Sequence, residues 1–406
     1  RPGLTWKYDQ KKGKGYSIRA PSNTSLTVPT IIPHQFVGVP NNGNITIAVT
    51  TPPADVGLSL VGNPYPSAIN AIDFINENLY DPILNPTNTL EGTLYFWSHN
   101  NRLVGNNFSA TDYFYYNLLG GSAGNTGTGN DNPPTEFIAS GQGFIVQNEV
   151  AGSLRFNNTM REVNNNTNFY KIKNTTKIKE LEKHRIWLNL TNSSSNVSQA
   201  LVGYIENATD GYDRGYDSYV FDDTAPFLLY SLIGTDKLAI QSKGLPFVDS
   251  SVVPLGYSID TNGPASIAID HVDGIFLDGQ NIYLEDKVLN LVHDLKAAPY
   301  DFSTLVGTFN DRFILLYTNK NLATVDFDKN NNKVLVSIKN SQLKVNSQME
   351  LIDKIIVSDV TGKVIYQKNN VDAKEFSVLN LMANQQMLLV KITLQNGAVI
   401  AKKIVY

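Results

Sequence analysis

The sequence contains no cysteine, which excludes disulfide bonds and thiolate metal sites. No run of apolar residues reaches about 18, the length at which a segment becomes a candidate transmembrane helix. Charged residues make up only 17% of the 406 residues and the net charge is -4, so the basic footprint of a nucleic-acid-binding protein is missing. Hydrophobic residues still make up 42%, too many for a disordered chain and enough for several domains with their own cores.

What the sequence does contain is typical of an all-β protein. It has 20 tyrosines and 18 phenylalanines, and short segments of alternating polarity separated by turn residues. We predict tandem β-sandwich or jelly-roll domains followed by a small Ig-like β-sandwich. The domains are predicted over residues 1–165, 184–320 and 333–406, because the polar stretches 164–183 and 319–332 separate them.

The first predicted domain combines short strands with one helix. The helix is predicted over 67–79, capped by Ser67, with an apolar face of Ile69, Ile72, Ile75 and Leu79. A glycine-rich loop is predicted over 120–134. The predicted strands are Leu4–Tyr8, Gly15–Ala20, Asn44–Thr50, Leu58–Val61, Thr93–Trp97, Tyr113–Tyr116, Gly141–Val146 and Ser153–Phe156.

The second predicted domain consists of strands with turns at regular spacing, as a sandwich or jelly roll requires. The predicted strands are Arg185–Leu190, Leu201–Glu206, Phe227–Ser231, Leu238–Ser242, Ser266–His271, Gln280–Asp286 and Asp311–Thr318.

The end of the chain is predicted to form two hairpins and a further strand, Glu375–Val378. Ile355–Val357 and Val364–Tyr366 flank a turn that contains Gly362. In the last hairpin Asn396-Gly397 is predicted to form a two-residue turn. That turn sets the register: Leu394 faces Val399, Ile392 faces Ala401, Leu388 faces Val405, and Lys391 faces Lys402.

This terminal segment resembles the C-terminal sorting domain of cargo proteins of the bacterial type IX secretion system. The matching elements are the hairpin Val357–Lys363, the strand Leu388–Ile392, Asn396-Gly397 and the terminal Lys402–Val405. Asn384–Met387 stands where the commonest variant has Gly-x-Tyr, so the segment is more similar to the variant called type C. The segments Gly62–Ala68, Ser140–Val146 and Arg155–Arg161 also resemble sequences found directly upstream of such sorting domains.

The resemblance implies an exported protein whose last domain is an export signal. Its partners would be the outer-membrane translocon and a shuttle protein, and its location the cell surface or the medium, reached through the periplasm. Because the chain starts at Arg1 without a methionine or signal peptide, we expect it to be part of a longer product. The residues that the resemblance assigns to the export signal are Asp359, Gly362, Lys363, Leu388, Leu389, Val390, Lys391, Asn396, Gly397, Lys402 and Lys403.

The facing pair Lys391 and Lys402 suggests a docking surface, because like charges directly opposite one another weaken a hairpin. Lys403 is adjacent to this pair. The alternative is a charged sheet edge that discourages aggregation.

A cluster of aspartates raises the question of a metal. Oxygen ligands in a loop suit Ca²⁺, but no recognised ligand spacing is present, so we predict turn-forming aspartates and no cofactor. Asp326–Asn332 starts like a calcium loop but has Asn331 and Ser337 where that loop needs glycine and glutamate. The clustered residues are Asp210, Asp213, Asp217, Asp222 and Asp223.

Other candidate sites carry weaker signals. Asp223-Thr224-Ala225 matches a short O-glycosylation motif that the resemblance makes relevant. The histidines form no catalytic signature, and the loop 120–134 lacks the Gly-Lys-Ser/Thr of a phosphate-binding loop, so no enzyme is predicted. The histidines are His34, His99, His184, His271 and His293.

The predicted function is therefore that of a secreted, non-catalytic passenger, part of an adhesin, with a C-terminal export signal. A glycan-binding module is the first alternative, because aromatic residues alternate on two strands and are suited to stacking on sugars. The second is an accessory region of a secreted hydrolase. The aromatic candidates, with one histidine, are Trp97, His99, Tyr113, Tyr115 and Tyr116.

Overall fold

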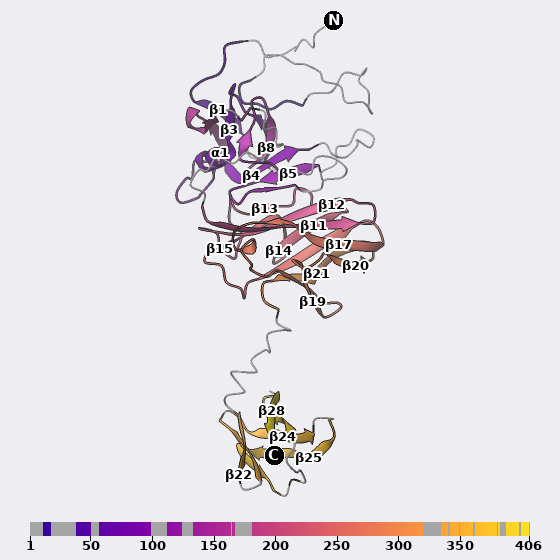
Figure 1. The fold of residues 1–406 in the computed structure, drawn as a ribbon. Coiled ribbons are helices and arrows are strands. Elements are labelled where there is room, and N and C mark those ends of the chain that lie inside the picture. The colour runs from indigo at the N-terminus through magenta and orange to yellow at the C-terminus, as the bar shows by residue number, and fades with distance from the viewer. Residues whose placement is uncertain are drawn as a thin grey trace. The chain divides into compact units, whose positions relative to one another are not determined.

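The computed structural model describes residues 11–17, 38–49, 57–98, 112–123, 133–163, 165–166, 181–319, 334–339, 342–348, 350–359, 362–379, 381, 387–397 and 399–405. Within these ranges the protein is all-β with a single α-helix, as the sequence predicts (Figure 1). It divides into two compact units, Arg1–Thr318 and Asn319–Tyr406. No helix in the described residues is long and apolar enough to cross a membrane.

The first part of unit 1 consists of three small antiparallel sheets around one helix. The five-stranded sheet has the order β2 (Leu58–Gly62), β8 (Gly143–Asn148), β4 (Leu90–Trp97), β5 (Tyr113–Tyr116), β6 (Gly121–Ser122). The other sheets are β1 (Ile45–Val49) with β9 (Gly152–Phe156), and β10 (Arg161–Glu162), β3 (Ala68–Asn70), β7 (Phe137–Ile138). A 3₁₀ turn, η1, covers Asn158–Met160.

The helix α1 is shorter than predicted. It spans Ala71–Asn78, and its N-cap is Asn70, whose side-chain oxygen accepts from the Ile72 and Asp73 N–H groups. The predicted start at Ser67 is wrong because residues 68–70 are a strand that pairs with β7 and β10. The buried face therefore consists of Ala71, Phe74, Ile75 and Asn78.

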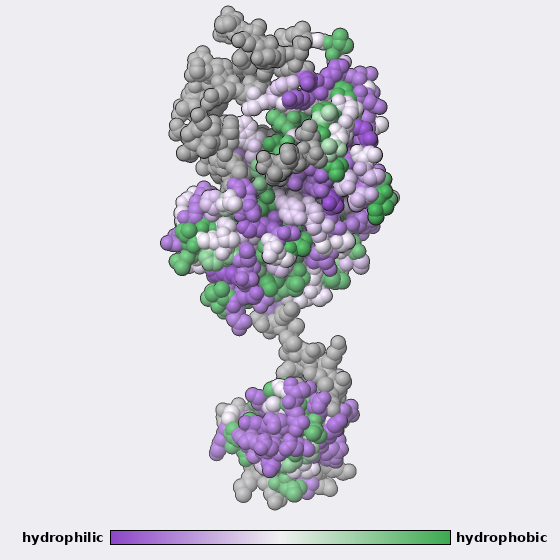
Figure 2. All heavy atoms as spheres, turned by 180° about the vertical axis from the view of Figure 1, so that it is seen from behind, coloured by the Kyte–Doolittle hydropathy of each residue, from purple (hydrophilic) through white to green (hydrophobic). Residues whose placement is uncertain are grey.

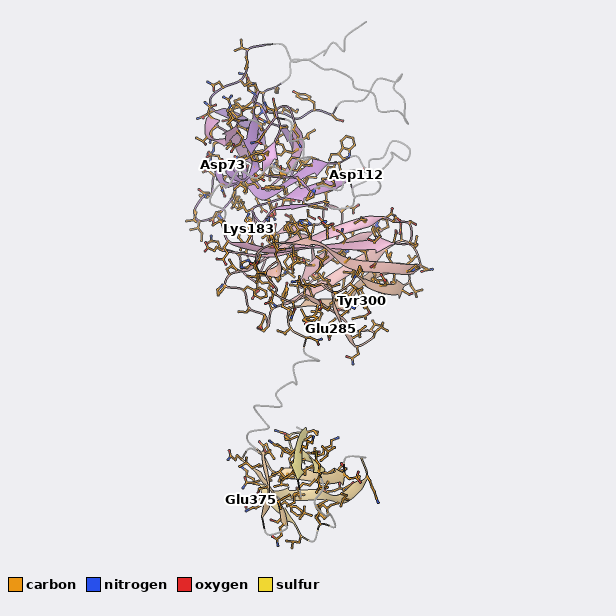
Figure 3. The ribbon with its side chains drawn as sticks, in the orientation of Figure 1. Asp73, Asp112, Lys183, Glu285, Tyr300 and Glu375 are labelled. Carbon is orange, nitrogen blue, oxygen red and sulfur yellow. The ribbon has the colours of Figure 1, made fainter. Side chains whose placement is uncertain are left out.

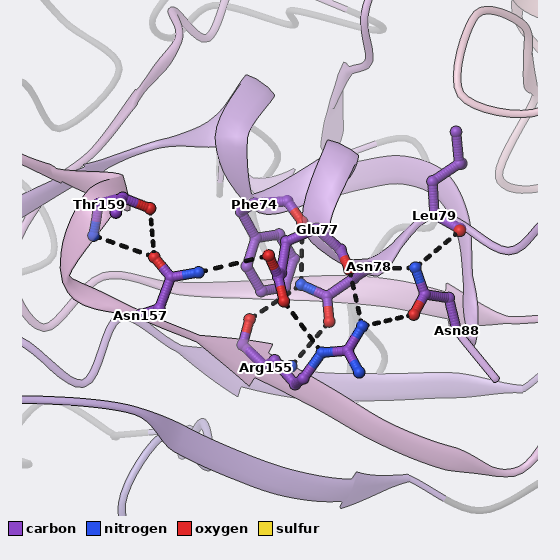
Figure 4. Close-up of polar contacts among 8 residues, drawn as sticks. All are labelled: Phe74, Glu77, Asn78, Leu79, Asn88, Arg155, Asn157 and Thr159. Atoms are coloured by element: carbon purple, nitrogen blue, oxygen red, sulfur yellow. Dashed lines mark hydrogen bonds and ion pairs between the residues drawn. The ribbon is translucent and has the colours of Figure 1, made fainter. Parts of the chain in front are cut away.

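The end of α1 is fastened to β9 by a polar cluster around Arg155 (Figure 4). The Asn78 amide donates to the Arg155 carbonyl (2.9 Å) and its oxygen accepts from the Arg155 N–H (2.7 Å), which mimics one rung of a sheet. The Arg155 guanidinium donates to Glu77 Oε1 (3.0 Å) and to Asn88 Oδ1 (2.6 Å). These contacts add to the apolar packing of the helix on β9, where the Phe74 and Phe156 ring centroids lie 4.8 Å apart.

The second part of unit 1 is one large sheet that nearly closes into a barrel. All seven strands predicted for this region are present. In the described residues the strand order of this sheet is β19 (Leu291–Asp294), β18 (Tyr283–Asp286), β21 (Gly307–Leu316), β16 (Val252–Ile259), β14 (Leu228–Ile233), β15 (Asp236–Gly244), β12 (Val197–Ile205), β11 (Lys183–Asn192), β17 (Gly263–Val272), β20 (Tyr300–Thr304). The short strand β13 (Ser218–Tyr219) also pairs with β15, and a 3₁₀ turn, η2, covers Gly274–Phe276.

The two ends of this sheet are brought together by a buried polar group. Tyr300 on β20, labelled in Figure 3, donates to the Asp286 carboxylate at the end of β18 (2.8 Å). Arg312 on β21 donates to the same carboxylate (2.8 Å) and to the Ser303 carbonyl (3.1 Å). Side chains from strands at both ends of the order share one inner core, including Leu284 and Phe302.

Part of the outer face of the large sheet, on β11, β12, β14 and β15, is also buried, because the five-stranded sheet packs on it. Tyr95, Tyr115 and Leu119 share a core, here called the shared core, with Trp187, Leu201 and Tyr230 of the large sheet. Strand β12 is accordingly buried along almost its whole length, which suits its mostly apolar second half, Ala200–Ile205. Residues 1–165 and 184–320, predicted as separate domains, thus share one of their cores.

The terminal unit is a β-sandwich with its own core. One sheet has the order β22 (Val334–Lys339), β23 (Gln342–Ser347), β26 (Glu375–Val378), and the other β25 (Val364–Ala373), β24 (Ile352–Asp359), β27 (Met387–Leu394), β28 (Val399–Val405). Side chains from both sheets form a single cluster that includes Val345, Ile355 and Val390. Glu375 of β26, labelled in Figure 3, pairs with Lys344 on β23 (2.9 Å).

The predicted register of the last hairpin is wrong by one residue. Thr393 faces Val399 and Lys391 faces Ala401, so Lys402 lies opposite Val390 instead of Lys391. The Gly397 N–H donates to the Leu394 carbonyl (2.9 Å), which places Gly397, with φ of 84°, at the fourth position of the turn. Four residues, 395–398, therefore lie between the strands, and every side chain of β28 changes face relative to the predicted register.

Several predicted segments lie outside the described residues. These are the strand Leu4–Tyr8, the end of the predicted strand Gly15–Ala20, most of the loop 120–134, and most of the stretches 164–183 and 319–332. The prediction for Gly15–Ala20 is wrong in its described part, because residues 15–17 form no strand and the chain there makes only an isolated bridge between Lys14 and Val61. Of the remaining strands predicted for the first domain, all are present, with ends that differ by up to three residues.

Gly92 and Gly215 provide a test of the packing in unit 1. Gly92 has φ of 125°, and a Cβ there would lie 2.3 Å from the Gly215 Cα. We expect Gly92→Ala to lower the free energy of unfolding by more than about 2 kcal/mol, because backbone strain and a backbone clash add.

The matched control is Gly234→Ala, measured by the same urea denaturation. Gly234 has φ of 61° but open space around it, so only the strain of roughly 1 kcal/mol applies. Equal losses for the two variants would contradict the close approach at Gly92.

Candidate functional sites

The predicted sorting hairpin is a tight turn closed by Asp359. The Asp359 N–H donates to the Lys363 carbonyl (3.0 Å), and the Lys363 N–H donates to the Asp359 carboxylate (3.0 Å). Gly362 has φ of 87°, which a residue with a side chain rarely adopts. Asp359 and Gly362 thus shape the turn, and Lys363 is exposed at its end. The two residues between Asp359 and Gly362 lie outside the described part of the chain.

Strand β27 divides the other predicted signal residues between core and surface. Leu388 and Val390 are fully buried in the sandwich core, whereas Leu389 and Lys391 face outward. Asn396 and Gly397 are exposed in the loop. The predicted signal residues therefore differ in their structural roles: some form the core, some form the turns, and a few lie on the surface.

The register collects three lysines on one side of the terminal sheet. Lys354, Lys391 and Lys403 share a face with Ile356 and Leu389, here called the outer face of the terminal sheet. Lys402 points to the opposite side, beside the buried Val390. At the paired positions of the described strands no acidic residue lies on this outer face. In the view of Figure 2 the surface of the terminal unit is mostly hydrophilic with isolated hydrophobic patches.

The clustered aspartates form separate turns. Asp210 pairs with Lys243 (2.5 Å), the Asp213 carboxylate accepts from the Thr209 hydroxyl (2.9 Å), and the Asp222 carboxylate accepts from the Thr224 N–H (2.9 Å). Asp223 is exposed, and its carbonyl accepts from the Lys237 ammonium (2.8 Å). Within the part of the chain that the structure describes, no three His, Asp or Glu side chains are grouped to hold a metal ion. Asp326–Asn332 lies outside that part.

Asp217, the fifth aspartate, is fully buried next to the shared core. Its carboxylate accepts from the Ser242 N–H (2.6 Å), the Ser242 hydroxyl (3.0 Å) and the Asp213 N–H (2.7 Å). Burial raises the pKa of Asp217 to about 7, although these hydrogen bonds act in the opposite direction. A second buried carboxylate, Glu91, accepts from the Tyr212 hydroxyl, and burial raises its pKa as well.

The predicted sugar-stacking aromatics are internal. Tyr115 and Tyr116 are each only 5% exposed, and the Tyr115 hydroxyl accepts from the Phe221 N–H (3.0 Å). The Tyr113 ring stacks on Phe221 with centroids 4.4 Å apart. These residues hold the two parts of unit 1 together and offer little surface to a glycan. Trp97 is half-buried at the end of β4, and His99 lies outside the described residues.

The three described histidines lie in different environments. His184 is buried beside Glu182, His271 stacks on Trp187 (3.9 Å between centroids), and His293 lies near Tyr300. His34 lies outside the described residues. Thr224, the predicted glycosylation residue, is exposed in a turn where its hydroxyl donates to Asp222 (2.6 Å).

The three segments upstream of the sorting module that the resemblance singled out meet in space. The Asn63 amide donates to the Ile138 carbonyl (3.0 Å), and the Ser140 hydroxyl donates to the Tyr65 carbonyl (2.8 Å). From the third segment, the Arg161 guanidinium lies 5.3 Å from the centroid of the Tyr65 ring. Residues far apart in the sequence therefore fix the loop 62–66.

A cavity of about 410 Å³ lies beside this junction. One wall is the turn 11–16, which carries Lys11, Lys12 and Lys14, and all three lysines are exposed. The other walls are residues 38–41, 62–66, 140–141 and Gly143. The sequence did not predict this site. The lysine-rich turn can be recognised in the sequence, but the residues that form the other walls are more than 20 residues away along the chain.

Comparison with known proteins gives two matches to family models. The model described as Domain of unknown function (DUF8694) matches residues 322–406, and that described as Domain of unknown function (DUF8693) matches residues 6–317. The gap between them coincides with the division between the two units. No curated protein matches the chain. Because the longer match spans more than half of the sequence, the chain belongs to the family described as Domain of unknown function (DUF8693).

The buried Asp217 predicts a pH-dependent stability. Its pKa is about 7 in the folded protein and about 3.9 in an unfolded chain, so the folded state binds the extra proton between these values. This contribution to stability is fully present below pH 4 and is lost as the pH rises through 7. We expect the free energy of unfolding to fall by a few kcal/mol from pH 5 to 8, and Asp217→Asn to remove much of that slope.

The measurement is urea denaturation at several pH values. The control is Asp260→Asn, which removes an exposed carboxylate from the turn after β16. A slope that is the same in the wild type and in Asp217→Asn would show that Asp217 is ionised throughout.

Proposed function

We propose that residues 333–406 are a sorting module that directs the chain to the bacterial type IX secretion system. The observation that carries the proposal is that the residues of the resemblance lie in one compact unit with its own core at the end of the chain. An export signal of this kind has to fold independently of its passenger, and a unit with a separate core meets that requirement. The two family matches divide at the same place, which supports a modular end.

The partners of this module would be the outer-membrane translocon and a shuttle protein, and the protein would be secreted or displayed on the cell surface. The outer face of the terminal sheet is the surface that suits such a contact. It presents Lys354, Lys391 and Lys403 around Leu389 and Ile356, and an acidic partner would complement it. The observed register supports a docking surface on this face better than the predicted register did, because Lys391 and Lys403 lie on the same side of the sheet.

Residues 1–318 would then be a non-catalytic passenger, part of an adhesin. The extensive hydrogen bonding between its two parts suits a rigid surface domain: Trp187 Nε1 donates to the Gly121 carbonyl (2.8 Å), and the Asn117 amide to the Tyr216 carbonyl (2.7 Å). A glycan-binding passenger is the second candidate, and the cavity beside the lysine-rich turn is the observation that favours it.

Removal of residues 333–406 tests the sorting proposal. We expect the truncated protein to remain folded and to accumulate in the periplasm, because unit 1 has its own cores. Cell fractionation with an antibody to unit 1 measures the location, and resistance to protease measures folding. Normal secretion of the truncated protein would refute the sorting role.

The outer face is tested by the double variant Lys391→Thr with Lys403→Thr. Threonine has a high strand propensity, so stability should stay within about 0.5 kcal/mol while export decreases. Lys368→Thr, on the exposed edge strand β25, is the matched control and should leave export unchanged. If the double variant is exported like the wild type, the lysines only protect the sheet edge and recognition takes place elsewhere.

A further inference from the structure

We infer that the cavity beside the turn 11–16 is a binding site for an acidic saccharide, a sugar that carries carboxylate or sulfate groups. Lys11, Lys12 and Lys14 would hold the anionic groups, and Tyr16 with the neighbouring prolines would contact the sugar ring. The site lies in unit 1, so the inference does not depend on the role of the terminal unit.

The backbone that carries the lysines is fixed to the sheet. The Gly62 N–H donates to the Gly13 carbonyl (2.9 Å), and the Gly15 N–H donates to the Leu60 carbonyl (3.0 Å). The Lys11 N–H donates to the Tyr16 hydroxyl (2.8 Å), which closes the turn. Because the turn is held in place before any ligand arrives, little backbone entropy is lost on binding.

The turn can approach the sheet this closely only because residue 13 is glycine. Gly13 is buried with φ of 73°, and a Cβ there would lie 2.4 Å from Ile47 Cδ1. Glycine at position 13 therefore permits the turn conformation that places three lysines within four residues on one wall of the cavity. A lysine-rich turn without such anchoring would be an ordinary solvated segment.

The positive charge of the three lysines that line the cavity favours an anionic ligand. No Asp or Glu is among the described residues that line it. In the same part of the chain none of the three lysines forms an ion pair with a carboxylate. Three ammonium groups that are not paired with a described carboxylate favour charge-assisted hydrogen bonds to a carboxylate or sulfate of a ligand. This local concentration of positive charge lies in a chain whose net charge is -4.

The rest of the lining favours a saccharide over a bare inorganic ion. Tyr16 is 41% exposed, and Pro40, Pro64 and Pro66 supply apolar surface for the C–H face of a sugar ring. Asn41 uses its amide N–H on the Pro64 carbonyl (2.8 Å), and its side-chain oxygen would be the acceptor for a ligand hydroxyl. The volume of about 410 Å³ is in the range of small-molecule sites.

An acidic peptide is less suited to this site. Peptides in extended conformation commonly bind by adding a strand to a free sheet edge. β2 is the edge strand of its sheet, but its free side is already occupied by residues 13–15, with Lys14 bridged to Val61. The cavity therefore offers side chains and an apolar surface, but no open edge for backbone pairing.

Calorimetric titration of the full chain tests the inference. The probes are a trigalacturonate, a heparin-derived tetrasaccharide and a neutral galactotriose of similar length. We expect binding of at least one acidic probe, no binding of the neutral one, and weaker binding at 0.5 M than at 0.05 M NaCl. The two acidic probes distinguish a carboxylated from a sulfated ligand.

Variants locate the binding in the cavity. Lys11→Gln with Lys12→Gln and Lys14→Gln should weaken binding by at least about tenfold, because three charge-assisted contacts are lost. Tyr16→Ala should weaken it severalfold. Lys12→Gln alone is compared with Lys287→Gln, an exposed lysine elsewhere in unit 1, and only the former should weaken binding. Circular dichroism confirms that each variant is folded.

Four results would overturn the inference. These are no binding of either acidic saccharide at millimolar concentration, equal binding of the neutral probe, unchanged affinity of the triple variant, and equal or tighter binding of a glutamate oligomer of the same charge. The last result would identify an acidic peptide as the ligand.

Discussion

The structure of unit 1 depends on one constraint: its large sheet is apolar on both faces along β11, β12, β14 and β15. The inner face closes on itself, but the outer face presents residues such as Trp187, Leu201 and Tyr230 that need a second layer. Tyr95, Tyr115 and Leu119 supply it. At about 25 cal/mol per Å² of apolar surface, a few aromatic side chains at this contact stabilise the unit by several kcal/mol. The five-stranded sheet is therefore part of the packing of the large one.

The arrangement of the inner face of the large sheet depends on a buried polar group, the Asp286 carboxylate. Asp286 is fully buried at the end of β18, where burial alone would raise its pKa, yet hydrogen bonds from Arg312 and Tyr300 hold that pKa below its usual value. The guanidinium also lies 4.7 Å from the ring centroid of Phe302 and 4.9 Å from that of Phe313. A buried ion pair contributes less to stability than to geometry, since its partners must meet in one arrangement. Here that arrangement joins strands from both ends of the sheet.

The sequence predicted most strands because alternation is a local signal, and it failed where the outcome depends on distant residues. β16 was missed because Pro254 interrupts it; the proline lies beyond the stretch of β16 that pairs with β14. The start of α1 was misplaced because β7 and β10 pair with residues 68–70. In the last hairpin, the observed register buries Ile400, whereas the predicted register would have buried Ala401. The cavity was invisible for the same reason, since its walls come from four separate segments.

The net charge of -4 says little about the partners of this chain, because charge is segregated on its surface. Three lysines line the cavity in unit 1, and three others share the outer face of the terminal sheet. In each place the lysines stand on a backbone that glycine turns and strand register hold fixed. No carboxylate is among the described residues that line the cavity or at the paired positions of the outer face. Elsewhere carboxylates are engaged with nearby groups, as Asp210 is with Lys243 and Glu77 with Arg155. A lysine that is paired with a carboxylate stabilises the fold locally, whereas one held apart from carboxylates keeps its charge available for a ligand. This contrast is the physical reason to look for anionic partners at these two surfaces before any other.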